Sequence, residues 1–115
     1  MPAESYSFKA VPEIRSFEEE MLHIAGSSIF FVSYVGGEAP DLNFEPENPT
    51  KEMVIDLMEK SNAHVRSVIA ATSDEEMAVV VETFAGELSK QAVCWFMRDH
   101  VTHHRARCAV LLRLK

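Results

Sequence analysis

The chain has 115 residues, of which 47% are hydrophobic and 25% are charged. This composition excludes a disordered chain and predicts a single domain over residues 1–115. Acidic residues outnumber basic residues by 18 to 11, for a formal net charge of −7, which argues against nucleic acid and anionic membranes as partners because both require a basic face.

No segment approaches the ~20 consecutive apolar residues of a membrane-spanning helix. The N-terminus shows no basic region followed by an apolar run, so no signal peptide is predicted. Cys94 and Cys108 fall on one predicted helix, about 21 Å apart, which is too far for a disulfide. We therefore expect a cytoplasmic protein with reduced thiols and no membrane partner.

Residues 1–15 are predicted to be irregular, since prolines interrupt them. A first helix is predicted over residues 16–35. Ser16 and Glu19 have the spacing of a capping box, and Gly36 with Gly37 provides a stop signal. Apolar residues point to several sides of this helix, which predicts burial over most of its surface.

Residues 38–49 contain three prolines and are predicted to form a loop. Thr50 is the expected N-cap of a second helix that runs to about residue 71. After a break at residues 72–76, β-branched valines and Gly86 predict an irregular or extended connection over residues 78–88. Ser89 is the expected N-cap of a last helix that runs to about residue 114. The predicted fold class is all-α.

Three of the five histidines lie within residues 99–105. His100 and His104 are four residues apart, so on a helix they project from one side and can bind one metal ion. Both fall on the apolar arc of the last helix, whereas His103 falls at its edge, where it can reach water. Two buried imidazoles need partners, because an unsatisfied buried polar group costs about 1–3 kcal/mol. A shared metal ion would supply one partner. The apolar arc comprises Val93, Met97, Val101, Cys108, Leu111 and Leu112, and the far side carries Arg98, Arg105 and Arg113.

His23, on the first helix, is the candidate third ligand. Gly26 and Ser27 leave room on the same face, and Glu19 also lies there. The alternative is that His23 is an ordinary hydrogen-bonded core histidine, and the same alternative holds for the His100–His104 pair.

Two further residues, His64 and Cys108, are of types that can bind metal ions but have simpler interpretations. His64 lacks a comparable context and is interpreted as an exposed helix residue. Cys108 follows His104 by four residues and is interpreted as a small buried apolar residue rather than a ligand. Val101 stands where a zinc protease of the His-Glu-x-x-His type has its glutamate, so that class is excluded.

Three segments resemble the DinB/YfiT-like family of proposed metalloenzymes: residues 6–17, residues 22–25 around His23, and residues 99–105, which contain the His-x3-His pair. The resemblance implies an up-down four-helix bundle, often dimeric. It also implies that His23, His100 and His104 hold a divalent ion with coordination sites open to water or substrate. Relatives include transferases that use low-molecular-weight thiols, and metal-dependent isomerases.

The sequence departs from the family pattern in two ways. Ala106 and Arg107 replace the Gly-Gln that usually ends the family signature, so we expect altered packing or substrate contacts beside an intact metal site. The resemblance also implies a long first helix ahead of the segment that opens this chain, and we expect that helix to be missing.

We expect this loss to leave a groove lined by Ile29, Phe31 and Val32 of the first helix. Either a partner copy covers the groove in a two-fold homodimer, or residues 1–15 fold back over it through Tyr6, Phe8 and Val11.

Three functions are compatible with the sequence. The first is an enzyme that activates a thiol or water and acts on a small electrophile. Its metal would be zinc by preference, with nickel, iron or manganese as alternatives, since three histidines discriminate poorly. The second is a non-catalytic metal-binding bundle with a stress-related or regulatory role. The third is a metal-free oligomerising helical domain.

Overall fold

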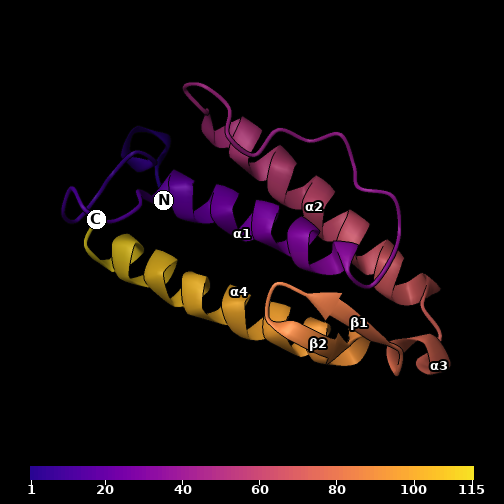
Figure 1. Cartoon of the computed structure of the whole chain (residues 1–115). Coiled ribbons are helices and arrows are strands. Elements are labelled where there is room, and N and C mark those ends of the chain that lie inside the picture. The colour runs from indigo at the N-terminus through magenta and orange to yellow at the C-terminus, as the bar shows by residue number, and fades with distance from the viewer.

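The computed structural model describes residues 1–115 and is mostly helical (Figure 1). Three long helices dominate it: α1 (Phe17–Ser33), α2 (Lys51–Ala71) and α4 (Lys90–Arg113). The predicted helices are therefore confirmed to within two residues at each end. A short helix, α3 (Asp74–Met77), and two strands, β1 (Val80–Thr83) and β2 (Gly86–Ser89), connect α2 to α4. None of these helices combines the length and the apolar character that crossing a membrane requires.

The start of α1 is the predicted capping box. The Glu19 backbone N–H donates to the Ser16 hydroxyl at 3.2 Å, and the Ser16 backbone N–H donates to the Glu19 carboxylate at 2.7 Å. The helix ends at Ser33, and Gly37 then takes a φ of +80°. A Cβ at Gly37 would lie 2.7 Å from a methyl carbon of Val68, so both backbone conformation and space require glycine there.

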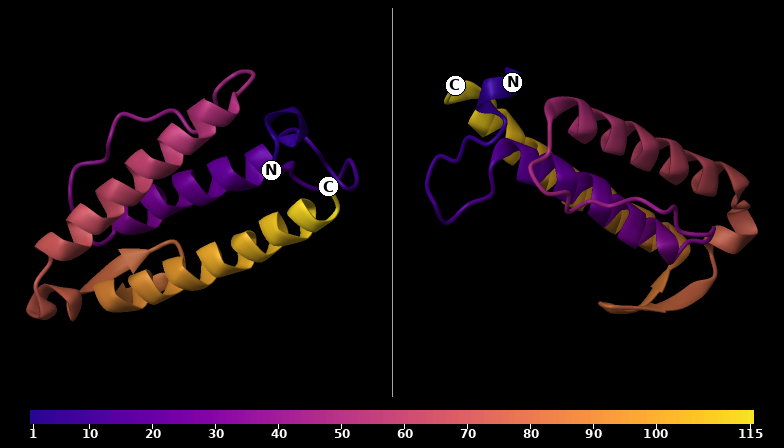
Figure 2. Two further views of the ribbon diagram at one scale, coloured as in Figure 1. Left: turned by 180° about the vertical axis from the view of Figure 1, so that it is seen from behind. Right: turned by 90° about the horizontal axis from the view of Figure 1, so that it is seen from above.

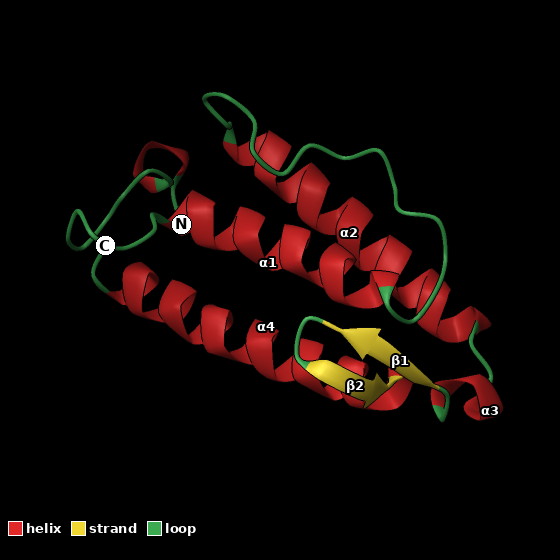
Figure 3. Cartoon of the chain, viewed as in Figure 1, coloured by secondary structure: helices red, strands yellow, loops and turns green.

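The connection over residues 78–88 is more regular than predicted. Strands β1 and β2 form an antiparallel hairpin in which Val80 pairs with Ser89 and Thr83 pairs with Gly86 (Figure 3). Gly86 has a φ of +92°, and the Thr83 hydroxyl donates to the Gly86 carbonyl at 2.7 Å. The all-α prediction is thus correct for the three main helices and incomplete for this segment, because β-branched residues beside a glycine turn form a local strand pair.

Helix α1 lies between α2 and α4 and packs against both (Figures 1 and 2). Two clusters of buried apolar side chains stabilise this arrangement, one toward each end of α1. The cluster nearer the termini consists of Tyr6, Phe17, Leu22, Ile24, Val54, Leu57, Cys108 and Leu111. The cluster nearer the hairpin consists of Phe31, Val32, Val35, Val68, Val93 and Met97.

The N-terminal segment folds back onto the start of α1. The Tyr6 ring is buried edge-on against Phe17, with ring centroids 5.2 Å apart. The Phe17 and Glu18 backbone N–H groups donate to the Phe8 and Tyr6 carbonyls. Val11, by contrast, is exposed. The segment therefore covers the first turn of α1 through Tyr6 and Phe8, and the predicted contribution of Val11 is wrong.

An apolar groove does run along α1, lined there by Phe17, Met21 and Ile24, but the predicted lining by Ile29, Phe31 and Val32 is wrong. All three side chains are buried within the single chain. Phe31 and Val32 share an apolar cluster with residues of both α2 and α4, including Val68 and Met97. The physical reason is that α2 and α4 cover α1 from two sides, which already buries this part of its surface.

Candidate metal centre

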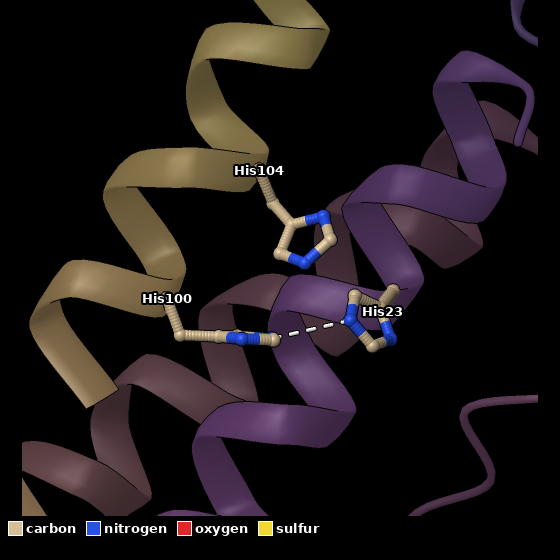
Figure 4. Close-up of side chains that lie close together, drawn as sticks. All are labelled: His23, His100 and His104. Carbon is tan, nitrogen blue, oxygen red and sulfur yellow. Dashed lines mark hydrogen bonds between the residues drawn. The ribbon is translucent and has the colours of Figure 1, made fainter. Parts of the chain in front are cut away.

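His23, His100 and His104 meet between α1 and α4, as Figure 4 shows. Each offers a ring nitrogen, and these nitrogens all lie within 4.8 Å of one another. The shortest separation is 3.1 Å, between Nε2 of His100 and Nε2 of His23. The structure therefore brings together the three histidines that the sequence singled out, in an arrangement that could hold a divalent metal.

Local helix geometry and the packing of α1 on α4 both contribute to this convergence. His100 and His104 lie one turn apart on α4, and their ring centroids are 4.4 Å apart. His23 faces them from α1, with its ring centroid 5.1 Å from that of His100 and 4.3 Å from that of His104. His104 is buried, whereas His23 and His100 are half-buried. The cluster is thus anchored at one side and accessible to solvent at the other.

Glu20 lies behind His104 and is the most deeply buried charged residue of the chain, with only 1% of its surface exposed. Its Oε2 lies 2.6 Å from Nδ1 of His104, and its Oε1 accepts from the guanidinium of Arg107 at 3.3 Å. Because a carboxylate accepts hydrogen bonds, this contact assigns the proton to Nδ1 of His104. The lone pair of Nε2 then remains available to a metal ion.

Burial also favours neutral rings at the other two positions. It lowers the pKa of His23 to about 4, with smaller contributions from Arg15 and from the two neighbouring histidines. Burial likewise lowers the pKa of His100, assisted by His104 and His103. Neutral imidazole is the form that coordinates metal ions, so both rings are in the ligating form at neutral pH.

The spacing of the nitrogens fits a metal ion. In a tetrahedral zinc site with Zn–N distances of about 2.0–2.1 Å, neighbouring nitrogens are about 3.3 Å apart. The 3.1 Å between His23 and His100 is close to that edge length. The nitrogens all lie within 4.8 Å of one another, so the rings need to approach by at most about 1.5 Å. Three imidazole nitrogens are a donor set that suits zinc and neighbouring transition metals. The hydrogen bond from Nδ1 of His104 to Glu20 is the kind of outer contact that orients a histidine ligand.

An open cleft of about 660 Å³ adjoins the cluster. His23, Gly26 and Ser27 form its α1 wall, and Phe44 lies on the opposite loop. A Cβ at Gly26 would lie 3.3 Å from the Phe44 side chain, so Phe44 takes up the space that Gly26 was predicted to leave beside His23. Arg15 stands at the mouth of the cleft and forms no ion pair.

The remaining candidates lie outside the cluster. His103 is exposed, with its ring edge-on to that of His104 at 5.0 Å. His64 is half-buried, so its predicted exposure is wrong. The turn after α1, at Gly37, lies against this part of α2 and covers one side of the ring. Cys108 is buried in an apolar cluster, as predicted, and burial raises its pKa to about 11.

Glu20 is the functional residue that sequence reasoning missed. Glu20 is one of three consecutive glutamates, Glu18–Glu20, in the first turn of α1. Acidic residues are favoured there by the helix dipole, so the run needs no functional explanation. The available signal was its spacing of three residues from His23, which places both on one face of α1. Arg107, noted only as a departure from a family pattern, is its second partner.

Comparison with known proteins agrees with this geometry. The DinB family matches residues 1–115. A DinB-like protein from Bacillus subtilis is 20% identical, with a TM-score of 0.77 over 97% of this chain and 76% of that chain. A DinB-like protein from Bacillus cereus is 19% identical, with a TM-score of 0.82 over 99% of this chain and 77% of that chain. No curated protein matches the sequence. These structures establish the likeness of fold.

Proposed function

The chain belongs to the DinB family, and from this premise we propose that it is a metal-dependent enzyme whose ion is held by His23, His100 and His104. The proposed reaction class is thiol-dependent transfer to a small electrophile, or a related hydrolysis. The observation that carries the proposal is the convergence of three ring nitrogens from two helices within 4.8 Å.

Each residue of the cluster has a separate role. The histidines supply three neutral nitrogen ligands and leave further coordination positions free for substrate. A bound divalent ion would lower the pKa of a coordinated thiol or water and so supply the nucleophile. Glu20 fixes the tautomer and orientation of His104 through the 2.6 Å contact. Zinc is the first choice of metal, with nickel, iron and manganese as alternatives.

The surroundings support a low-molecular-weight thiol as the second reactant. The two cysteines of the chain are both free, and the burial that raises the pKa of Cys108 to about 11 keeps this thiol protonated and unreactive at neutral pH. Burial raises the pKa of the Cys94 thiol as well, so the nucleophilic thiol of the proposed transfer comes from outside the chain. A reducing compartment such as the cytoplasm is where such a thiol and two free cysteines are both maintained.

Two measurements test the proposed function. Metal analysis of the purified protein, after reloading with zinc, should give one ion per chain. The zinc-loaded protein should then accelerate the transfer of a simple thiol to 1-chloro-2,4-dinitrobenzene above the rate of a His104→Ala variant. One ion per chain without any acceleration would contradict the enzyme and retain the metal site, whereas no ion would contradict both.

An alternative function is a non-catalytic metal-binding or oligomerising helical protein, such as a stress protein. It is favoured by an apolar groove of about 610 Å³ that lies over α1, with α2 and α4 on its two sides. The side chains that line it include Phe17 and Met21 of α1, Met58 of α2, and Val101 and Leu112 of α4. A homodimer formed through this groove would cover those side chains. Light scattering at micromolar concentration tests it. A constant mass of 12.9 kDa would reject the dimer, and twice that mass, abolished by Met58→Asp, would support it.

A further inference from the structure

Five aromatic side chains gather beside the histidine cluster, and we name them the aromatic patch. They come from three separate elements: α1, the turn of the hairpin, and α4. The members are Phe30, Phe31, Tyr34, Phe84 and Phe96. Figure 1 shows how the hairpin, which carries Phe84 in its turn, lies alongside the first half of α4.

The patch is continuous from ring to ring. Phe84 lies 5.7 Å from Phe30, 5.8 Å from Phe31 and 5.5 Å from Phe96, measured between ring centroids. Phe31 lies 5.5 Å from Phe96. These separations are those of favourable edge-to-face and tilted aromatic pairs. The five rings thus form one contiguous cluster, in which Phe31 is buried and the other four reach the surface.

This surface directly adjoins the candidate metal centre. Phe31 packs edge-on against His100, with ring centroids 5.2 Å apart. His100 in turn places its Nε2 3.1 Å from that of His23. Phe30 and His23 also line the same open cleft, so a molecule that coordinates at the three-histidine site has an exposed aromatic side chain at its flank.

The patch is also unusually exposed for so apolar a surface. Phe30, Phe84 and Phe96 expose 48%, 57% and 44% of their surfaces. Phe84 stands in a hairpin turn, where the backbone needs no aromatic residue and where a polar residue would be solvated at no cost. Contiguous exposed apolar surface beside a polar cluster is typical of a ligand-binding site.

The size of the patch favours a small molecule over a protein partner. An aromatic side chain buries about 150–250 Å² in full, so three half-exposed rings offer roughly 300 Å². A standard protein interface needs about 800 Å² from each partner. One aromatic ring of a ligand, stacked against Phe84 and Phe96, would cover most of what is exposed.

We propose that the aromatic patch binds an aromatic or similarly apolar group of the substrate while its reacting group lies at the three-histidine site. This proposal rests on the proposed function and narrows its substrate class to molecules with an aromatic part next to the reacting group. Phe84 and Phe96 are specificity residues in this arrangement, since they touch the part of the substrate that does not react.

A pair of metal-binding probes tests the proposal without relying on turnover. Benzohydroxamate and acetohydroxamate carry the same chelating group and differ in having a phenyl or a methyl substituent. Calorimetric titration of the zinc-loaded protein should give a preference of about tenfold for benzohydroxamate. Phe84→Ala and Phe96→Ala should each reduce that preference at least about threefold. Trp95→Ala is the matched control and should leave the preference unchanged. Trp95 is an exposed aromatic residue of the same helix, stacked with Arg98 and outside the patch.

The outcomes separate this proposal from the proposed function. Equal affinity of the native protein for the two probes, or a preference that survives both phenylalanine substitutions, would overturn the substrate class and retain the open metal site. Failure of both probes to bind the zinc-loaded protein would overturn the open metal site itself, and the patch proposal with it. A change in sedimentation mass on Phe84→Ala, with the probe preference unaltered, would make the patch an interface between copies of the chain.

Discussion

Helix α1 packs against α2 on one side and α4 on the other, and the two interfaces differ in chemistry. Between α1 and α2 the buried side chains are almost entirely apolar, among them Val54, Leu57 and Val68. The one buried side-chain hydrogen bond there joins the Ser61 hydroxyl to the Ala25 carbonyl at 2.8 Å. This interface is therefore formed by apolar packing and one buried hydrogen bond.

Between α1 and α4 the apolar contacts form two separate groups, one at each end of the interface. Cys108 and Leu111 pack near one end and Val93 with Met97 near the other. The middle is occupied by three imidazoles and the Glu20 carboxylate. No fully buried polar side-chain atom in the chain lacks a hydrogen-bond partner.

The difference indicates which interface stabilises the fold and which carries chemistry. Burying an ion pair or an imidazole cluster stabilises a protein less well than apolar packing of the same volume, because desolvation offsets the attraction. Sequences depart from the stabilising choice mainly at functional sites. The α1–α2 interface therefore fits the role of scaffold, and the α1–α4 interface carries the proposed site.

The largest effect is expected from removing one imidazole of the α1–α4 interface. His104→Ala deletes the ligand that Glu20 orients, and only two nitrogens remain, so stoichiometric zinc binding should be lost. His64→Ala is the control, since His64 lies on α2 outside the cluster. Equilibrium dialysis with metal analysis checks both variants. Full zinc binding by His104→Ala would show that the α1–α4 interface is not a metal site.

The second largest effect should come from the scaffold interface. Leu57→Ala leaves a cavity beside α1 and should lower the free energy of unfolding by about 2–5 kcal/mol. Urea denaturation followed by circular dichroism measures this loss. The zinc affinity of the folded variant should match that of the native protein. A marked loss of affinity would mean that the two interfaces are coupled through α1.

Glu20→Gln tests the charge behind His104 while preserving its volume. Replacing a carboxylate that orients a metal-binding histidine typically weakens metal binding about 10–100-fold, and the same range is expected here. Glu18→Gln, on the same helical turn without a histidine partner, should leave zinc affinity unchanged. Titration calorimetry with zinc compares the two. Equal affinities in both variants would assign Glu20 a purely structural role.

The smallest effect concerns α1 itself, which both interfaces share. Ser16→Ala removes the N-cap hydroxyl and should destabilise the fold by about 1 kcal/mol without altering zinc affinity. A change in zinc affinity would show that the cap positions the site as well as the helix. Urea denaturation, with zinc titration of the folded protein, measures both.

The capping box should also make stability depend on pH. The hydrogen bond from Lys9 lowers the pKa of Glu19 below its ordinary value of 4.5. A lowered carboxyl pKa stabilises the fold above the unfolded value, and that contribution is lost as pH falls through the folded value. The Glu19→Gln variant should therefore approach the native protein in stability as the pH falls below 4.5 and through the lowered pKa of Glu19. A gap between the two that stays constant from neutral pH down to acid would contradict this linkage.

The sequence by itself determined the three long helices and the placement of His100 and His104 on one side of the last helix. Capping residues such as Ser16, Thr50 and Ser89 act on backbone groups three residues away, so they are legible without a fold. The common direction of His100 and His104 follows from helix periodicity alone. The same reasoning placed His64 at the surface and Phe31 in an open groove, because periodicity says which residues share a face and not what covers that face.

Only the tertiary structure decided what meets across the chain. Glu20 and His104 are 84 positions apart, and His23 and His100 are 77 apart. Spacing places both Glu19 and Glu20 on the face of α1 that carries His23, and only the packing of α4 against α1 selects Glu20. The sequence likewise did not predict that the hairpin turn brings Phe84 into contact with Phe30 and Phe96. The physical reason is that backbone hydrogen bonding is local and can be inferred residue by residue, whereas a site formed by two helices depends on how they pack.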